Sequence, residues 1–291
     1  MNLIRDAFAL LATCATIAAT PASAQQPTPS APPKVLKIER DWLKPGKYGT
    51  HENVEAEFPR AAAGAKDNWH WLALGSETGP RQLWAVIGFD SFAEWQKSEA
   101  AMENMPAFDE GLQRLHERDG SILWRDDVLA AVYDESLSYR PIAGWQRMRF
   151  YLVTTFQIRA GHDYDFLEID RLTRAAHEEA KIDEHWVVYR VISGAPTGTY
   201  LVFAPMKSLK ELDESDARHA PYLQALGDLG QKKLHELEAM AYERESEDVF
   251  AVNPKLSYVS KEWAESDPEF WTPKPAGAKS STPSRKEAAK P

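Results

Sequence analysis

The sequence predicts an α+β fold in which one βαββαβ unit occurs twice in tandem. Three observations predict it. Strand-like and helix-like segments follow one another in the same order in the two halves of the chain. Short matches link the halves at a nearly constant spacing. The second strand of each half is apolar on both faces, which is expected of a sheet that is covered on both sides.

Composition excludes several classes of protein. The 291 residues include 34 Lys and Arg against 44 Asp and Glu, so the formal net charge is 34 − 44 = −10. This acidic balance argues against nucleic acid as a partner. A hydrophobic fraction of 43% is enough for a sizeable core. The single cysteine, Cys14, excludes a disulfide framework and any cysteine-based metal site.

The N-terminal segment has the pattern of a secretory signal. An apolar run from Ala7 to Ala19 is followed by Ala22-Ser23-Ala24, a small-x-small cleavage site. A membrane span needs about 20 apolar residues, so this run is too short to be one, and lipidation at Cys14 would cut it in half. We expect cleavage near Ala24 and a periplasmic or secreted protein.

The predicted domain organisation places the folded unit between two polar ends. A Pro-rich linker covers residues 25–33, and a disordered basic tail covers residues 263–291, where Pro, Lys and Ser predominate towards the end. The first repeat is expected at 34–143 and the second at 144–262.

Four ordered matches carry the repeat. Each match joins a short segment of the first half to an identical or similar segment of the second half. The two segments are 115 residues apart in the first two matches and 119 residues apart in the last two. They pair Lys44–Lys47 with Arg159–His162, His70-Trp71 with His185-Trp186, Leu115–Glu117 with Leu234–Glu236, and Leu137–Tyr139 with Leu256–Tyr258.

Alternation, turn residues and caps place the elements of each half. For the first half we expect strands at Val35–Trp42, Asn68–Leu74, Gln82–Phe89 and within Ile122–Tyr139, with helices at Tyr48–Ala65 and from Ser91 to Arg118, interrupted at Pro106. For the second half we expect strands at Arg149–Ile158, Glu184–Val191, Thr199–Phe203 and Asp248–Tyr258, with helices at Tyr164–Ala180 and Ser208–Glu245.

This order is that of the ferredoxin-like unit. The chain resembles the dimeric α/β-barrel superfamily, in particular its NIPSNAP-like and antibiotic-biosynthesis-monooxygenase-like groups. The strand and turn at Val35–Lys47, echoed at Leu152–His162, and the aromatic strands at Trp69–Leu74 and His185–Val191 carry the resemblance, which covers roughly residues 34–260. It implies two tandem ferredoxin-like repeats that form an intramolecular dimeric α/β-barrel, as a monomer or a homodimer.

Strand alternation separates the members of each His-Trp pair. We expect Trp71 and Trp186 to face the space between the sheets, because large rings suit a cavity. His70 and His185 would then face the helices and bond backbone carbonyls.

Aromatic and basic residues on these strands are the candidate ligand-binding set: Trp69, Trp71, Trp84, Trp186 and Arg190. The weak catalytic candidates are His70, His185 and Arg190. His116 and His235 are expected on solvated helix faces. No HExxH, P-loop, GxGxxG or GxSxG motif occurs in the sequence, so we expect no metal site and no cofactor.

These observations leave three hypotheses for the function. The first is a protein that binds a small apolar or aromatic molecule between its sheets, with no nucleic acid and no membrane span. The second, from the resemblance, is a cofactor-free mono-oxygenase of an aromatic substrate. The third, also from the resemblance, is a haem protein with one of the paired histidines as its axial ligand.

Overall fold

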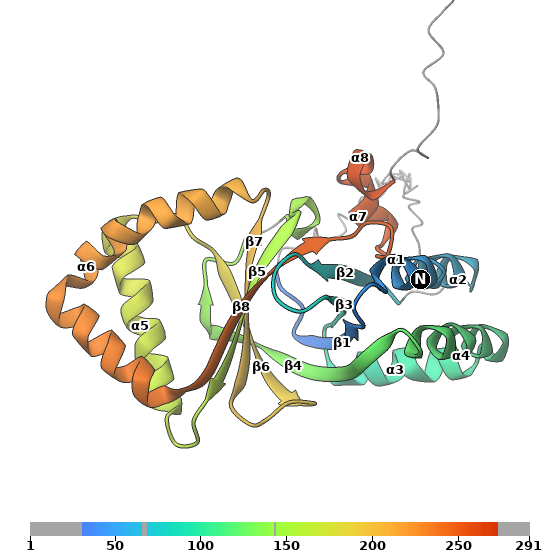
Figure 1. The fold of residues 1–291 in the computed structure, drawn as a ribbon, viewed down its shortest axis with the longest axis horizontal. Helices are drawn as coiled ribbons and strands as arrows, with labels where there is room; N and C mark the ends of the chain where they lie inside the picture. Colours follow the sequence, from blue (N-terminus) through green and yellow to red (C-terminus); the bar gives the residue numbers. More distant parts are fainter. Residues whose placement is uncertain (1–30, 66–68, 143, 273–291) are drawn as a thin grey trace, which may run out of the picture.

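In the computed structural model, residues 31–65, 69–142 and 144–272 are described. Their eight strands form a closed antiparallel barrel in the order β1-β3-β2-β8-β5-β7-β6-β4 (Figure 1). The strands of the first half are β1 (Val35–Leu43), β2 (Trp71–Ser76), β3 (Gln82–Phe89) and β4 (Leu123–Tyr139). Those of the second half are β5 (Phe150–Ile158), β6 (Trp186–Ser193), β7 (Thr199–Met206) and β8 (Tyr242–Val252).

The two halves have the same strand pairing. β1 pairs with β3 and β4, and β3 pairs with β2. In the same way, β5 pairs with β7 and β8, and β7 pairs with β6. The barrel closes where β2 pairs with β8 and β4 pairs with β6. Each half therefore covers the two strand edges that the other half leaves open.

Helices cover the outside of the barrel in two groups (Figure 1). The first group is α1 (Tyr48–Glu55), α2 (Phe58–Ala65), α3 (Phe92–Glu103) and α4 (Pro106–Gly120). The second group is α5 (Asp163–Ala180) and α6 (Lys210–Ala241). As the sequence predicts, Ser91 caps α3, since its side chain accepts a hydrogen bond from the Glu94 N–H. Across the described residues, no helix is long and apolar enough to cross a membrane.

The main core lies inside the barrel because apolar residues occur at every second strand position. Leu36 and Ile38 of β1 point inward and meet Val153 of β5 and Leu201 of β7. The positions between them point outward to the helices. Val188 of β6, for example, belongs to a separate cluster that contains Phe166 of α5.

Two short helices correct the expected start of the tail. Residues 263–272 do not begin a disordered segment, because α7 (Lys261–Glu265) and α8 (Pro268–Trp271) pack on the barrel. Trp271 is buried, and its indole N–H donates to the Gln146 carbonyl oxygen. The other tail residues, 273–291, lie outside the described residues, as do the expected signal segment and most of the linker.

The last strand also begins earlier than expected. β8 starts at Tyr242 and not at Asp248, and α6 ends at Ala241. The polar run from Glu243 to Glu247 is exposed on this strand and gives no apolar alternation, which is why the sequence pattern places the strand too late. α6 itself is broken at Gly227, whose positive φ of 62° is not helical.

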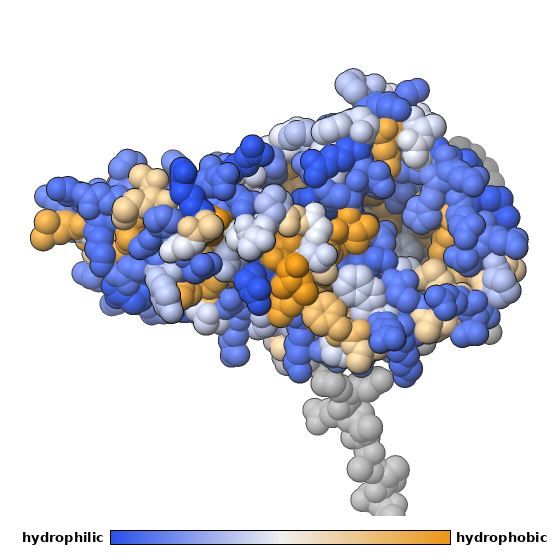
Figure 2. Space-filling model, turned by 90° about the horizontal axis from the view of Figure 1, so that it is seen from below, coloured by the Kyte–Doolittle hydropathy of each residue, from blue (hydrophilic) through white to orange (hydrophobic). Residues whose placement is uncertain are grey.

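The outer surface is mainly hydrophilic. On the face seen from below, Figure 2 shows the largest group of hydrophobic residues near the middle and smaller groups towards both ends. Exposed apolar side chains elsewhere are mostly single, as is normal for a folded protein.

Candidate ligand-binding site

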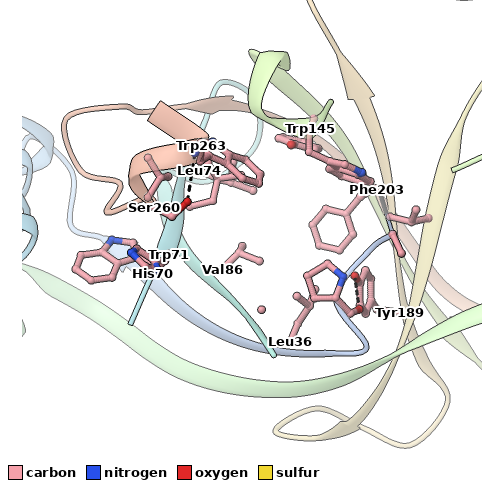
Figure 3. A pocket seen from close by; sticks show the side chains of 17 residues that line it. Leu36, His70, Trp71, Leu74, Val86, Trp145, Tyr189, Phe203, Ser260 and Trp263 are labelled. Atoms are coloured by element: carbon pink, nitrogen blue, oxygen red, sulfur yellow. Dashed lines mark hydrogen bonds between the residues drawn. The ribbon is translucent and has the colours of Figure 1, made fainter. Parts of the chain in front are cut away.

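A cavity of about 310 Å³ lies inside the barrel. This volume is at the lower end of the about 300–1,000 Å³ that is typical of small-molecule sites. Side chains from both halves line it, and most are apolar. The apolar side chains that the strands contribute include Leu36, Leu72, Leu74, Val86, Val187 and Phe203 (Figure 3).

The two tyrosines that line the cavity differ in their hydrogen bonding. The Tyr189 hydroxyl donates to the Pro33 carbonyl oxygen at 2.9 Å (Figure 3). The Tyr151 hydroxyl is buried and has no hydrogen-bond partner among the described residues. Burial raises the pKa of both hydroxyls, so each stays protonated and can donate. A buried donor without a partner costs about 1–3 kcal/mol, which a ligand with an acceptor atom would recover.

Aromatic rings close the cavity beside Tyr151. Trp145, in the short 3-10 helix η1 (Trp145–Arg147), stacks on Tyr151 with ring centroids 5.6 Å apart and planes at 15°. The Phe203 ring meets the Tyr151 ring edge to face at 6.5 Å. This arrangement presents flat apolar surfaces on two sides, which suits an aromatic or alicyclic molecule.

The opposite side of the cavity is formed by the N-terminal end of β2 and the start of α7. His70, Ser260 and Trp263 lie together there, facing Trp145, Phe203 and Tyr189 across the cavity (Figure 3). Ser260 caps α7 by accepting a hydrogen bond from the Trp263 N–H at 3.2 Å. The His70 ring stacks on Tyr258 at 5.2 Å. Among the described residues that line the cavity, His70 is the only histidine, and it lies beside the start of α7.

The expected orientation of the His-Trp pairs is wrong for His70 and Trp186, whereas Trp71 does line the cavity and His185 does lie against a backbone carbonyl oxygen. Leu72 and Leu74 point into the barrel, which puts His70 on the cavity side of its strand. In β6 the inward residues are Val187 and Tyr189. Both faces of these strands are apolar, so alternation alone could not say which face was internal.

Trp186 lies on the outer, helix-covered face. It packs in the cluster that contains Phe166 of α5, and its indole N–H donates to the Leu137 carbonyl oxygen at 3.0 Å. Trp71 lies mainly on the outer face too, with its N–H donated to the Leu256 carbonyl oxygen at 2.8 Å, although it borders the cavity as well. Of the two tryptophans, Trp71 and Trp186, only Trp71 therefore lines the cavity.

The structure separates the other candidates from the cavity. Trp69 packs on the outer face of the first half, and Trp84 is buried in the barrel core against Phe250. Arg190 is exposed on the outside of β6. His185 precedes β6, and its Nδ1 lies 2.7 Å from the Arg140 carbonyl oxygen.

The candidate set drawn from the sequence lacks five aromatic residues of the site: Trp145, Tyr151, Tyr189, Phe203 and Trp263. Tyr151 lies inside a predicted strand. Its inward position follows from alternation once β5 is known to lie between β8 and β7 in the barrel. Trp145, Phe203 and Trp263 are brought to the cavity by long-range packing, and no local spacing links them. The Trp263, Phe270 and Trp271 group was the one local sign that the segment after residue 260 is folded.

Comparison with known proteins supports the fold. No protein-family model and no curated protein matches the chain. Among solved structures, an anthrone oxidase-like protein has a TM-score of 0.51 and 14% identity, covering 80% of this chain and 97% of its own. A mutant chlorite dismutase from Candidatus Nitrospira defluvii has a TM-score of 0.48 and 10% identity, covering 81% and 96%. A "putative monooxygenase" from Lactobacillus acidophilus NCFM has a TM-score of 0.45 and 7% identity, covering 76% and 94%.

The likeness to the anthrone oxidase-like protein supports the barrel fold. The superfamily and its NIPSNAP-like group stay predictions. At these identities the likeness concerns the fold alone, since one fold hosts many activities.

The described cavity does not suit haem. An axial histidine would have to be His70, because the other paired histidines lie outside this cavity. Among the described residues that line it, none is Lys or Arg, so no cation is placed to pair with the two propionates of haem. The apolar walls favour a smaller and less charged molecule.

Proposed function

We propose that this protein binds one small, mostly apolar ring compound in the barrel cavity, oriented by a hydrogen bond from Tyr151. The observation that carries the proposal is the buried hydroxyl of Tyr151, which has no hydrogen-bond partner among the described residues and belongs to a residue that lines the apolar cavity. A few fixed polar groups on an apolar wall are the usual composition of a small-molecule site.

The test uses 2-naphthol and naphthalene, which differ by one hydroxyl. Affinities for the purified chain are measured by titration calorimetry and by competition. We expect 2-naphthol to bind, and its preference over naphthalene to fall about 10-fold in Tyr151→Phe, because one hydrogen bond to a buried group is worth roughly 1.4 kcal/mol.

Tyr189→Phe is the matched control. It removes a hydroxyl from the same cavity, but one that already bonds to Pro33, so the preference should not change. If neither compound binds, or if the two variants reduce the preference equally, the proposed site is wrong.

A mono-oxygenase reaction is a second candidate, favoured by the position of His70 on the cavity wall. His70 could accept a proton from a phenolic substrate, whose electrons then reduce O₂. One oxygen atom would enter the substrate and the other would leave as water. Oxygen uptake with polycyclic phenols, lost in His70→Gln while 2-naphthol binding is kept, would support catalysis. Binding without uptake would leave a binding protein.

Two further proposals concern the history and location of the chain. The repeated strand pairing supports a tandem duplication of one ferredoxin-like unit. The sequence pattern at residues 1–24 supports export to the periplasm or beyond. N-terminal sequencing of the exported protein should then begin at Gln25, whereas an intact Met1 would contradict export by cleavage.

A further inference from the structure

Four side chains with metal-binding atoms meet outside the barrel cavity, between β1 and the helices of the first half. Asp41 comes from the outer face of β1, His51 and Glu55 from one face of α1, and Asp119 from the end of α4. One ligand atom from each lies within 4.8 Å of the others. The His51 Nε2 atom is 3.2 Å from an Asp119 oxygen and 3.5 Å from an Asp41 oxygen.

The cluster contains buried polar atoms that form no hydrogen bond among the described residues. His51 is 1% exposed and Asp119 is 4% exposed. The Asp119 Oδ1 atom has no hydrogen-bond partner in the part of the chain that is described, and the His51 Nε2 atom forms no hydrogen bond there although carboxylate oxygens of Asp119 and Asp41 lie near it. A buried polar atom without a hydrogen bond is costly, and here both such atoms belong to residues of one small cluster.

The charges in the cluster are also unbalanced. Three carboxyl groups surround one imidazole, and within the described residues no Lys or Arg forms an ion pair with any of the three. Lys37, on the same face of β1, pairs instead with Glu39 and Glu99.

The second half shows that the fold does not need such a cluster. The residues 115 positions after Asp41 and His51 are Phe156 on β5 and Phe166 on α5. Their rings pack together with centroids 5.6 Å apart. Apolar packing at this strand–helix contact avoids the desolvation of charged groups. Burying the carboxyl groups of the first half therefore costs free energy that the apolar packing of the second half avoids. A bound cation would offset this cost.

We propose that Asp41, His51, Glu55 and Asp119 bind one divalent first-row transition-metal ion. The 2+ charge of the ion would balance most of the carboxylate charge. The His51 Nε2 and Asp119 Oδ1 atoms, which form no hydrogen bond among the described residues, could coordinate the ion. The imidazole nitrogen favours ions such as Mn²⁺ or Zn²⁺ over Ca²⁺ and Mg²⁺, which prefer oxygen-only sites. Sequence motifs missed the site because only His51 and Glu55 are close in the chain.

The proposed ion would face a second cavity of about 400 Å³. Asp41, Glu55 and Asp119 line this cavity together with apolar side chains such as Phe58 and Trp69. Coordination positions that the protein leaves open could therefore take water or an oxygen atom of a small molecule.

Manganese binding to the purified chain, after removal of bound metal with a chelator, tests the proposal. Mn²⁺ is titrated by electron paramagnetic resonance of the free ion, with Zn²⁺ as competitor. We expect one Mn²⁺ per chain, displaced by Zn²⁺ but not by equal Mg²⁺. Asp119→Asn and Glu55→Gln should each weaken Mn²⁺ binding by at least about 10-fold.

Asp109→Asn is the matched control. Asp109 lies on the same helix and lines the same cavity as Asp119, but it is nearly three helical turns away (about 3.6 residues each), so Mn²⁺ affinity should not change. Mn²⁺ and Zn²⁺ should also raise the unfolding temperature of the unaltered chain, a readout that needs no variant. Absence of stoichiometric binding, or equal losses in all three variants, would overturn the proposal.

Discussion

Trp186 stacks on Tyr139 on the outside of the barrel, with ring centroids 4.6 Å apart and planes at 29°. Its neighbour Val187 lines the cavity on the inside. Two consecutive residues of β6 therefore serve different parts of the molecule: one holds α5 to the sheet, and the other shapes the site.

This difference predicts opposite effects of two substitutions. Trp186→Ala should lower the free energy of unfolding by about 3 kcal/mol, the lower end for buried aromatics because the ring is only partly buried, and leave 2-naphthol affinity unchanged. Val187→Phe should fill the cavity and abolish 2-naphthol binding, with about 1–3 kcal/mol of overpacking. Urea unfolding and titration calorimetry measure both. Loss of binding in Trp186→Ala would place the site elsewhere.

The two cavity tyrosines predict a second contrast, in stability without ligand. Tyr151→Phe removes an unpartnered hydroxyl and should leave the free energy of unfolding unchanged or raise it. Tyr189→Phe leaves the Pro33 carbonyl oxygen without its donor and should cost about 1–3 kcal/mol. Chemical denaturation of the two variants decides, and a cost for Tyr151→Phe as large as that for Tyr189→Phe would mean that the Tyr151 hydroxyl has a partner.

Glu184 predicts a loss of stability in acid. Its carboxylate lies 2.9 Å from the His177 Nε2 atom and accepts a hydrogen bond from Arg218 at 3.0 Å. Burial raises the pKa of Glu184, but these two partners outweigh burial and lower it to about 2. Because this value is below that of the unfolded chain, about 4.3, the contribution to stability is complete at neutral pH and is lost as the pH falls from about 5 towards 2.

Glu184→Gln should therefore be less stable than the unaltered protein by about 2 kcal/mol at pH 7, with the gap closing below pH 4. Glu179→Gln, on the exposed face of α5 shortly before the loop that carries Glu184, is the control and should show no such gap. Urea unfolding between pH 3 and pH 7 measures the effect. A gap that is constant with pH would exclude a role for the Glu184 charge.

Closure of the barrel predicts how half of the chain behaves alone. Without the second half, β2 loses its pairing with β8 and β4 loses its pairing with β6. Open edges and exposed apolar strand faces promote association. Residues 34–143 should form a dimer or aggregate in light scattering after gel filtration. A stable monomer of this fragment would show that the two halves do not depend on each other.

The sequence predicts the order and approximate bounds of most elements, since they depend on local periodicity and turn residues. It could not orient β2 and β6, because His70-Trp71 and His185-Trp186 stand in strands that are apolar on both faces. The choice between faces was made by packing of Trp186 against α5, a contact between distant segments.

The candidate sites depend even more on tertiary structure. Tyr151 and Trp263 are more than a hundred residues apart, and only closure of the barrel places both on one cavity. In the same way, Asp41 and Asp119 come together only when α4 packs on α1, the helix that follows β1, and their spacing in the chain gives no sign of it.

A crystal structure of the purified chain soaked with 2-naphthol tests the central claim most directly. We expect the naphthol rings inside the barrel between Trp145 and Val86, with the oxygen atom about 2.5–3.0 Å from the Tyr151 hydroxyl, the range of an O–H···O hydrogen bond. Naphthol bound only on the surface or in the second cavity, with the barrel cavity filled by ordered water, would contradict it.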